Sequence, residues 1–132
     1  MSIKLTSVLV LCGAAMGCVV NQDPPRSTPS HGTLTALWTL DGADDDLVCS
    51  YYAIDRVDVV VFDRDGYVVD DAQPYCEEFG LSFRLLADWY STEVTLLDFG
   101  GNAVSDTVIV DTQVPVDTEV FIDIDFPDAT IF

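Results

Sequence analysis

Between residues 33 and 126, apolar and polar side chains alternate in short runs, a pattern typical of β-strands with one buried face. In residues 119–126, every second residue from Val120 to Phe126 is apolar, and most of the others are acidic. Residues 33–40 show the same alternation, with threonines on the polar side. The pattern predicts seven strands, at 33–40, 55–62, 67–70, 80–86, 92–98, 103–110 and 118–126.

Turn-forming residues separate these runs. Residues 63–66 (Asp-Arg-Asp-Gly) and 98–102 (Asp-Phe-Gly-Gly-Asn) predict hairpins, because glycine accepts the positive φ of tight turns. Strand 55–62 is apolar on both faces and is predicted to be central. One short helical turn is expected near 45–52, with an aspartate as its N-cap. The prediction is an all-β protein, a single antiparallel β-sandwich.

A resemblance refines this fold. Residues 88–98 (Asp-Trp-Tyr-Ser-Thr-Glu-Val-Thr-Leu-Leu-Asp), with residues 100–104 behind them, resemble the strand-turn-strand segment of bacterial Ig-like and transthyretin-like (carboxypeptidase-regulatory-like) domains. Seven short strands in about 100 residues also suit an Ig-like sandwich. The resemblance implies a fold and no particular activity, since such sandwiches host many functions.

The first residues indicate export. Lys4 precedes an apolar run at 5–15, which is long enough for a signal peptide and too short to span a membrane. The next residues, Ala15-Met16-Gly17-Cys18, resemble the lipobox of bacterial lipoproteins, in which a signal peptidase cuts before an acylated cysteine. This resemblance implies that residues 1–17 are removed and that Cys18 carries the lipid.

Two alternatives remain open. In the first, Ala15 and Gly17 provide the small residues that ordinary signal peptidase requires, and cleavage there would release a secreted protein. In the second, the chain is a cytosolic protein with an apolar N-terminal helix. The number of cysteines favours lipidation. Cys12 leaves with the signal, so three cysteines remain, and one of them cannot pair within the chain. Acylation of Cys18 then leaves Cys49 and Cys76 to form a disulfide in an oxidising compartment.

Residues 18–32 are rich in Pro, Ser and Thr and predict a flexible tether that reaches about 40 Å. The folded domain is expected at 33–132. The whole layout is similar to small Gram-negative lipoproteins of unknown function, which implies an envelope protein, held in the outer membrane and facing the periplasm or the cell surface.

Acidic residues dominate the charge: 23 Asp and Glu stand against five Lys and Arg, giving a net charge of −18. Such a charge disfavours nucleic acid and anionic lipid as partners. The simplest explanation of the acidic excess is that it keeps the protein soluble and protects strand edges from pairing with other chains. The alternative is a Ca²⁺ site, since this ion prefers clustered carboxylates, although no EF-hand motif is complete. The candidate ligands are Asp41, Asp44, Asp45, Asp46, Asp63 and Asp65.

The residue inventory argues against an enzyme. His31, the one histidine, falls in the predicted tether, and the one lysine lies in the signal. A Ser or Cys nucleophile in the predicted domain would therefore have no His or Lys to act as its base. No cofactor other than possible Ca²⁺ is expected. Trp38 is predicted in the core. Trp89 and Tyr90 lie at a strand entrance, where one of them is expected to fill the end of the sandwich, although an exposed pair there would form a ligand-facing patch.

These observations predict a non-catalytic envelope lipoprotein. It would attach to the membrane through Cys18 and bind an unidentified protein or glycan, or serve as a structural component. A Ca²⁺-dependent adhesion or ligand-binding module is the alternative, and a small hydrolase is a more distant one.

Overall fold

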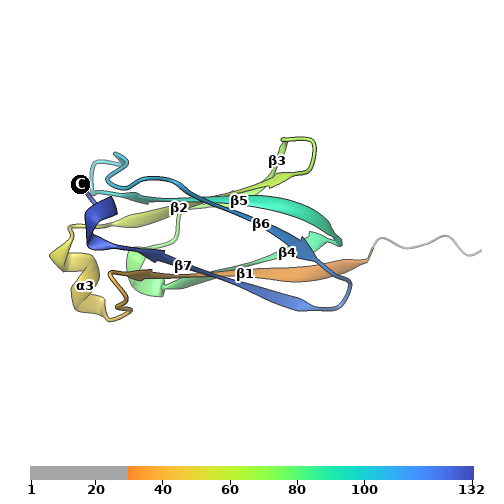
Figure 1. Ribbon diagram of the computed structural model, residues 1–132, viewed down its shortest axis with the longest axis horizontal. Helices are drawn as coiled ribbons and strands as arrows, with labels where there is room; N and C mark the ends of the chain where they lie inside the picture. The colour runs from red at the N-terminus through yellow and green to blue at the C-terminus, as the bar shows by residue number, and fades with distance from the viewer. Residues whose placement is uncertain (1–29) are drawn as a thin grey trace, which may run out of the picture.

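The computed structural model describes residues 30–132, and seven strands form within them. One sheet has the order β4-β1-β7, and the other has the order β3-β2-β5-β6. The strands are β1 (His31–Leu40), β2 (Arg56–Asp63), β3 (Val68–Ala72), β4 (Gly80–Leu86), β5 (Asp88–Leu97), β6 (Val108–Val114) and β7 (Glu119–Phe126). The sheets lie face to face as two layers (Figure 1). The predicted all-β sandwich is confirmed.

Alternating apolar side chains from both layers fill the space between the sheets. The largest of them, Trp38, is 1% exposed, and it lies on β1, the central strand of its sheet. The other strand residues of this buried core cluster are Leu34, Ala36, Leu40, Val57, Val59, Val61, Phe83, Leu85, Tyr90, Val94, Leu96, Val114, Ile122, Ile124 and Phe126. Strand β2 is central, as predicted, but Val60 and Phe62 on its outer face are half-buried rather than covered.

One strand pair departs from the predicted antiparallel arrangement. Strand β1 runs antiparallel to β4 but parallel to β7, with Thr33 opposite Glu119 and Leu40 opposite Phe126. A short hairpin forces its strands to be antiparallel, whereas strands that are far apart in sequence carry no such constraint. The first and last strands can therefore pair in the same direction.

Several strand boundaries differ from those predicted, including the starts of β5 and β6. Strand β5 begins at Asp88 rather than at 92, because residues 88–91 already pair with β6. Strand β6 begins at Val108 rather than at 103. Residues 103–107 make only isolated bridges, and the side chain of Ser105 replaces a ladder bond by accepting from the Leu96 N–H at 2.9 Å. The polar Ser105 thus interrupts the strand that alternation alone would extend.

The short helix and both turns form as predicted. Helix α3 (Asp46–Tyr51) is capped by Asp45, whose carboxylate accepts from the N–H groups of Leu47 and Val48. The turn at 63–66 joins β2 to β3, with Gly66 at φ 87°. The turn at 98–102 places Gly101 at φ 78°.

The predicted disulfide between Cys49 and Cys76 is present, with Cα atoms 6.0 Å apart. It joins α3 to the short 3-10 helix η2 (Cys76–Glu78), and both cysteines are fully buried. The indole Nε1 of Trp38 donates to the carbonyl oxygen of Cys76 at 3.0 Å. The core therefore contacts this cross-link through a buried hydrogen bond. A second 3-10 helix, η3 (Asp128–Thr130), follows β7.

Strand β1 begins at His31 rather than at 33, so two residues predicted in the tether belong to the sheet. Gly32 is required there, because a Cβ at this position would lie 2.1 Å from the carbonyl oxygen of Pro115. Within residues 30–132, no helix is long and apolar enough to cross a membrane. Cys18 and the predicted signal lie outside the described residues.

Removing the disulfide should destabilise the domain. The cross-link joins positions 27 residues apart, and in the chain-entropy model a loop of this size contributes about 3 to 4 kcal/mol. We expect Cys49→Ala/Cys76→Ala to lower the melting temperature by more than about 10 °C, since each kcal/mol is worth about 4 to 8 °C in so small a domain. Reduction of the unmutated protein is the control. Equal melting of the oxidised and reduced forms would contradict the prediction.

The turn at Asp98 should make stability depend on pH. Its carboxylate accepts from the N–H groups of Asn102 and Gly100 at 2.9 and 2.8 Å, and these bonds, Asn102 first, hold the pKa of Asp98 below its ordinary value. A lowered pKa stabilises the fold above the unfolded pKa of about 3.9, and the effect is lost as pH falls through the folded pKa. We therefore expect Asp98→Asn to melt below the unmutated protein at neutral pH.

That difference should shrink as the pH is lowered below about 4, where the carboxylate of the unmutated protein also becomes neutral. Melting curves of both proteins across the acid range provide the measurement. The matched control is Asp123→Asn, which removes an exposed carboxylate from β7. A deficit of constant size at every pH would rule out the charge of Asp98 as its cause.

Candidate functional site

A shallow depression of about 360 Å³ lies at one end of the four-stranded sheet, where β2 ends and β5 begins. The residues that line it are Asp63, Arg64, Trp89, Tyr90, Ser91 and Asp111. Antiparallel register brings them together, because Asp63 lies opposite Tyr90, and Ser91 lies opposite Asp111. We refer to this feature as the Trp89 depression.

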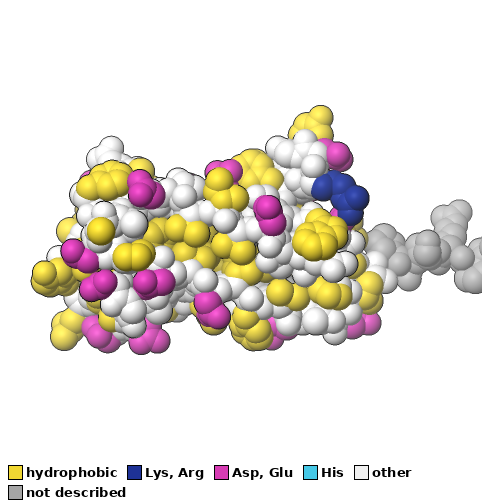
Figure 2. Space-filling view, in the orientation of Figure 1, with side chains coloured by type: hydrophobic (Ala, Val, Ile, Leu, Met, Phe, Trp, Pro, Cys, Tyr) yellow, Lys and Arg dark blue, Asp and Glu magenta, His cyan; other side chains and the backbone are white. Residues whose placement is uncertain are grey.

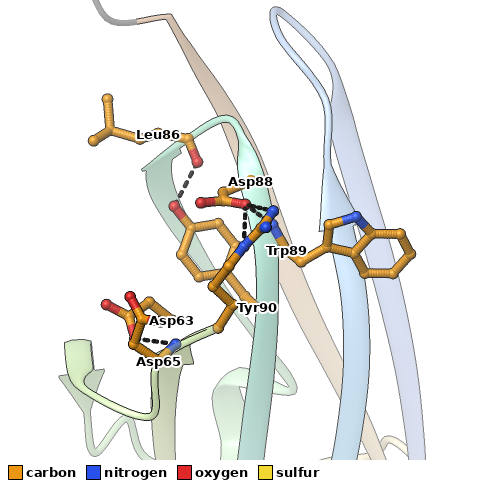
Figure 3. A network of polar contacts seen from close by, with 7 residues as sticks. Asp63, Asp65, Leu86, Asp88, Trp89 and Tyr90 are labelled. Atoms are coloured by element: carbon orange, nitrogen blue, oxygen red, sulfur yellow. Dashed lines mark hydrogen bonds and ion pairs between the residues drawn. The ribbon is translucent and has the colours of Figure 1, made fainter.

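The two aromatic residues at the start of β5 point to opposite sides of the sheet, as alternation requires. Tyr90 is 7% exposed and its hydroxyl donates to the carbonyl oxygen of Leu86, closing the end of the core (Figure 3). Burial raises the pKa of this tyrosine. Trp89 is 49% exposed, and its indole extends from the other side of β5. One of the two aromatics thus fills the end of the sandwich, as expected, and it is Tyr90 rather than Trp89.

An ion pair borders the depression. Both Nε and Nη2 of Arg64 donate to Oδ1 of Asp88, the former at 3.1 Å (Figure 3). The backbone N–H of Trp89 donates to the same oxygen at 2.8 Å. These contacts, the Trp89 N–H first and Arg64 second, lower the pKa of Asp88. Because both side chains are exposed, the ion pair adds little stability. It does hold the positive guanidinium of Arg64 against the carboxylate of Asp88.

Asp63 and Asp111 supply two carboxylates from opposite sides of β5. Oδ1 of Asp63 accepts from the N–H groups of Asp65 and Tyr67, both at 2.9 Å, and this fixes the side chain in the β2–β3 turn. Oδ2 of Asp63 takes no part in that turn. Asp111 is exposed on the outer face of β6. The depression therefore combines an aromatic surface with fixed and free oxygen acceptors.

The aspartates predicted as Ca²⁺ ligands do not gather at one place. Asp41, Asp44, Asp45 and Asp46 lie just before α3 or at its first residue, at the end of the sandwich where β2 starts. Asp63 and Asp65 lie at the other end, where β2 stops (Figure 1). In the part of the chain that the structure describes, no three or more His, Cys, Asp or Glu side chains are grouped to hold a metal.

Several of these carboxylates already have structural partners. Asp45 caps α3, and Asp63 closes its turn, as described above. Asp41 accepts from the N–H of Asp128 at 3.3 Å. Asp128 in turn accepts from the Tyr52 hydroxyl at 2.9 Å, and this bond raises the pKa of Tyr52 to about 12. These interactions account for the conformation of this acidic end without an ion.

The other aromatic and titratable residues spread widely. Tyr51 and Tyr75 are 80% and 51% exposed, and the Arg56 guanidinium carbon lies 4.0 Å from the centre of the Tyr75 ring. His31 lines a second, more polar depression of about 310 Å³ near the start of β1. Acidic side chains are scattered over the face seen in Figure 2, while basic ones appear only near the β2–β3 hairpin.

Sequence reasoning did not single out Arg64, Asp88, Ser91 or Asp111 as one site. The alternation of side chains along a strand was the one signal for this site in the sequence. It places Trp89 and Ser91 together on the outer face of β5, opposite to the buried Tyr90. The missing information was the register between β5 and its neighbours, which decides that Asp111 stands beside Ser91.

No protein-family model matches the chain, and no curated protein is similar to it. One solved structure similar to it is a Bacteroides thetaiotaomicron VPI-5482 protein of the DUF1812 group, a group described as proposed polysaccharide-binding proteins. The two chains are 12% identical and superpose with a TM-score of 0.45. The similarity covers 70% of this chain and 46% of that one, so this chain spans about half the length of that protein.

Proposed function

We propose that this chain is a non-catalytic binding module that holds an oligosaccharide in the Trp89 depression. The observation that carries the proposal is a half-exposed indole with hydrogen-bonding groups around it. A pyranose ring has apolar C–H faces and a rim of hydroxyl groups. An aromatic ring can cover the face while polar side chains reach the rim, which is the usual composition of a small-molecule site.

The polar groups suit hydroxyl recognition. Ser91 can donate or accept, Asp63 and Asp111 accept, and Arg64 brings further N–H donors to the border of the depression. A bare tryptophan surface would bind apolar partners without preference. The mixture of donors and acceptors supports a sugar as the ligand.

The shape of the site supports binding rather than catalysis. The depression is shallow and open to water, whereas catalytic carboxylates work best where water is excluded. One of its two carboxylates, Asp63, is already engaged by two backbone N–H groups. A module that captures a chain of sugars without cleaving it fits these features.

Attachment to a membrane through a lipid on Cys18 completes the proposal. Its support is the sequence Ala15-Met16-Gly17-Cys18 and the pairing of Cys49 with Cys76, which leaves Cys18 without a partner among the cysteines expected after processing. Several acyl chains on one cysteine anchor a protein without a spanning helix. The module would then hold its glycan at the cell envelope.

Loss of the indole should weaken sugar binding. We expect Trp89→Ala to weaken binding to a responsive polysaccharide by more than about tenfold, since stacked aromatic pairs are worth about 0.5 to 1.5 kcal/mol beyond their buried area. Trp89→Phe should retain part of the affinity. Affinity electrophoresis against a panel of soluble polysaccharides, followed by calorimetry, measures the effect.

The matched control is Phe121→Ala, which removes a 55% exposed aromatic side chain from β7 in the other sheet. It should leave binding unchanged. Equal loss in the Phe121 variant, or full affinity in Trp89→Ala, would place the sugar elsewhere.

The anchor can be tested separately. We expect Cys18→Ala to shift the protein from the membrane fraction to the soluble fraction, because the acceptor for the lipid is gone. Mass spectrometry of the mature N-terminus of the unmutated protein should show an acylated cysteine. An unmodified Cys18, or cleavage at another position, would overturn this part of the proposal.

A further inference from the structure

We infer that the Trp89 depression selects oligosaccharides that carry free amino groups, an inference that rests on the proposed function. The argument begins with charge. The lining contains two carboxylates, Asp63 and Asp111, and one basic side chain, Arg64. The guanidinium of Arg64 is already bound to the carboxylate of Asp88. The charge presented to a ligand is therefore negative.

The position of Asp111 fits a cation held near the indole. Trp89 lies opposite Gln113 of β6, and Asp111 is two residues away on the same outer face. Such diagonal positions are about 7 to 8 Å apart, within reach of a large aromatic side chain. Asp63 lies opposite Tyr90, so its side chain is on the face of Tyr90 and not on that of the indole. A sugar stacked on the indole would thus have the carboxylate of Asp111 beside it.

A protonated amine on the sugar completes this arrangement. An ammonium group presents three N–H donors, and its hydrogen bonds to carboxylates are about twice as strong as those between neutral groups. The exposed carboxylate of Asp111 is a suitable acceptor. A cation beside the indole also gains from the negative face of the aromatic ring.

The same charges reject acidic sugars. A uronate or sulfate group near Asp111 would meet like charge, and Arg64 can bind it only by giving up Asp88. The net charge of −18 adds a long-range repulsion to this local one. Neutral sugars would stack on Trp89 without the gain from the carboxylate. The expected order of affinity is amino sugar, neutral sugar, acidic sugar.

Three tetrasaccharides of matched length test the order: β-1,4-linked glucosamine, its N-acetylated form, and galacturonic acid. Calorimetry is performed at about pH 5.5, well above the pKa of about 3.9 of aspartate in model peptides. Salt is kept at about 0.15 M, where charges beyond about 8 Å are largely screened. We expect the glucosamine tetramer to bind more than about tenfold tighter than the N-acetylated one, which equals about 1.4 kcal/mol.

Three variants assign the preference to the site. Asp111→Asn should reduce the preference for the amino form several-fold, because it weakens binding of the glucosamine tetramer more than binding of the N-acetylated one. Trp89→Ala should weaken both. Asp123→Asn is the matched control, since it removes one exposed carboxylate from the outer face of the other sheet. It should leave the preference intact.

Each outcome has one meaning. Equal or tighter binding of the N-acetylated tetramer overturns the inference and leaves the proposed sugar site standing. An equal effect of Asp123→Asn and Asp111→Asn overturns it as well, because the attraction would then come from the whole acidic surface. Failure of all three tetrasaccharides, together with no effect of Trp89→Ala on any polysaccharide of the panel, overturns the proposed function itself.

Discussion

The buried hydrogen bond from Trp38 to the carbonyl of Cys76 is the interaction on which the rest of the structure depends. It joins the largest core side chain, on the central strand of one sheet, to the residue that the disulfide ties to α3. An indole buried without an acceptor would be costly, so this contact fixes where η2 must lie. The non-strand segments at this end of the sandwich are thereby held in place. The opposite end, where β2 stops and β5 starts, is left to turns and exposed side chains.

At that opposite end, one strand supplies both the closure of the core and the candidate site. Tyr90 turns inward and is held by the carbonyl of Leu86, while its neighbour Trp89 must turn outward. The closure by Tyr90 gives the outward indole a rigid base, because consecutive residues of one strand share a backbone. Sites on strands hold their geometry better than sites on loops. The position of Trp89 is therefore set by the packing of a different residue.

The sequence was sufficient for local features and insufficient for pairings between distant segments. Alternation placed Leu34, Trp38 and Ile124 on buried faces, and turn chemistry located the hairpin at 63–66. These signals lie within a few residues. The parallel pairing of β1 with β7, and the register that sets Asp111 beside Ser91, depend on contacts across the fold and have no local signature. Side-chain alternation allows only one of the adjacent aromatics Trp89 and Tyr90 to turn into the core, and the local sequence did not decide which one.

The entry of the chain into β1 has a practical consequence for orientation. The N–H of Ala87 donates to the carbonyl of Ser30 at 2.9 Å, and His31 lies opposite Leu86, the residue that also accepts from Tyr90. The chain thus enters beside the Trp89 depression, and it ends at Phe132 at the far end of the sandwich (Figure 1). A fluorophore, affinity tag or sensor surface joined ahead of Ser30 shares space with an incoming ligand, whereas one joined after Phe132 leaves that approach free.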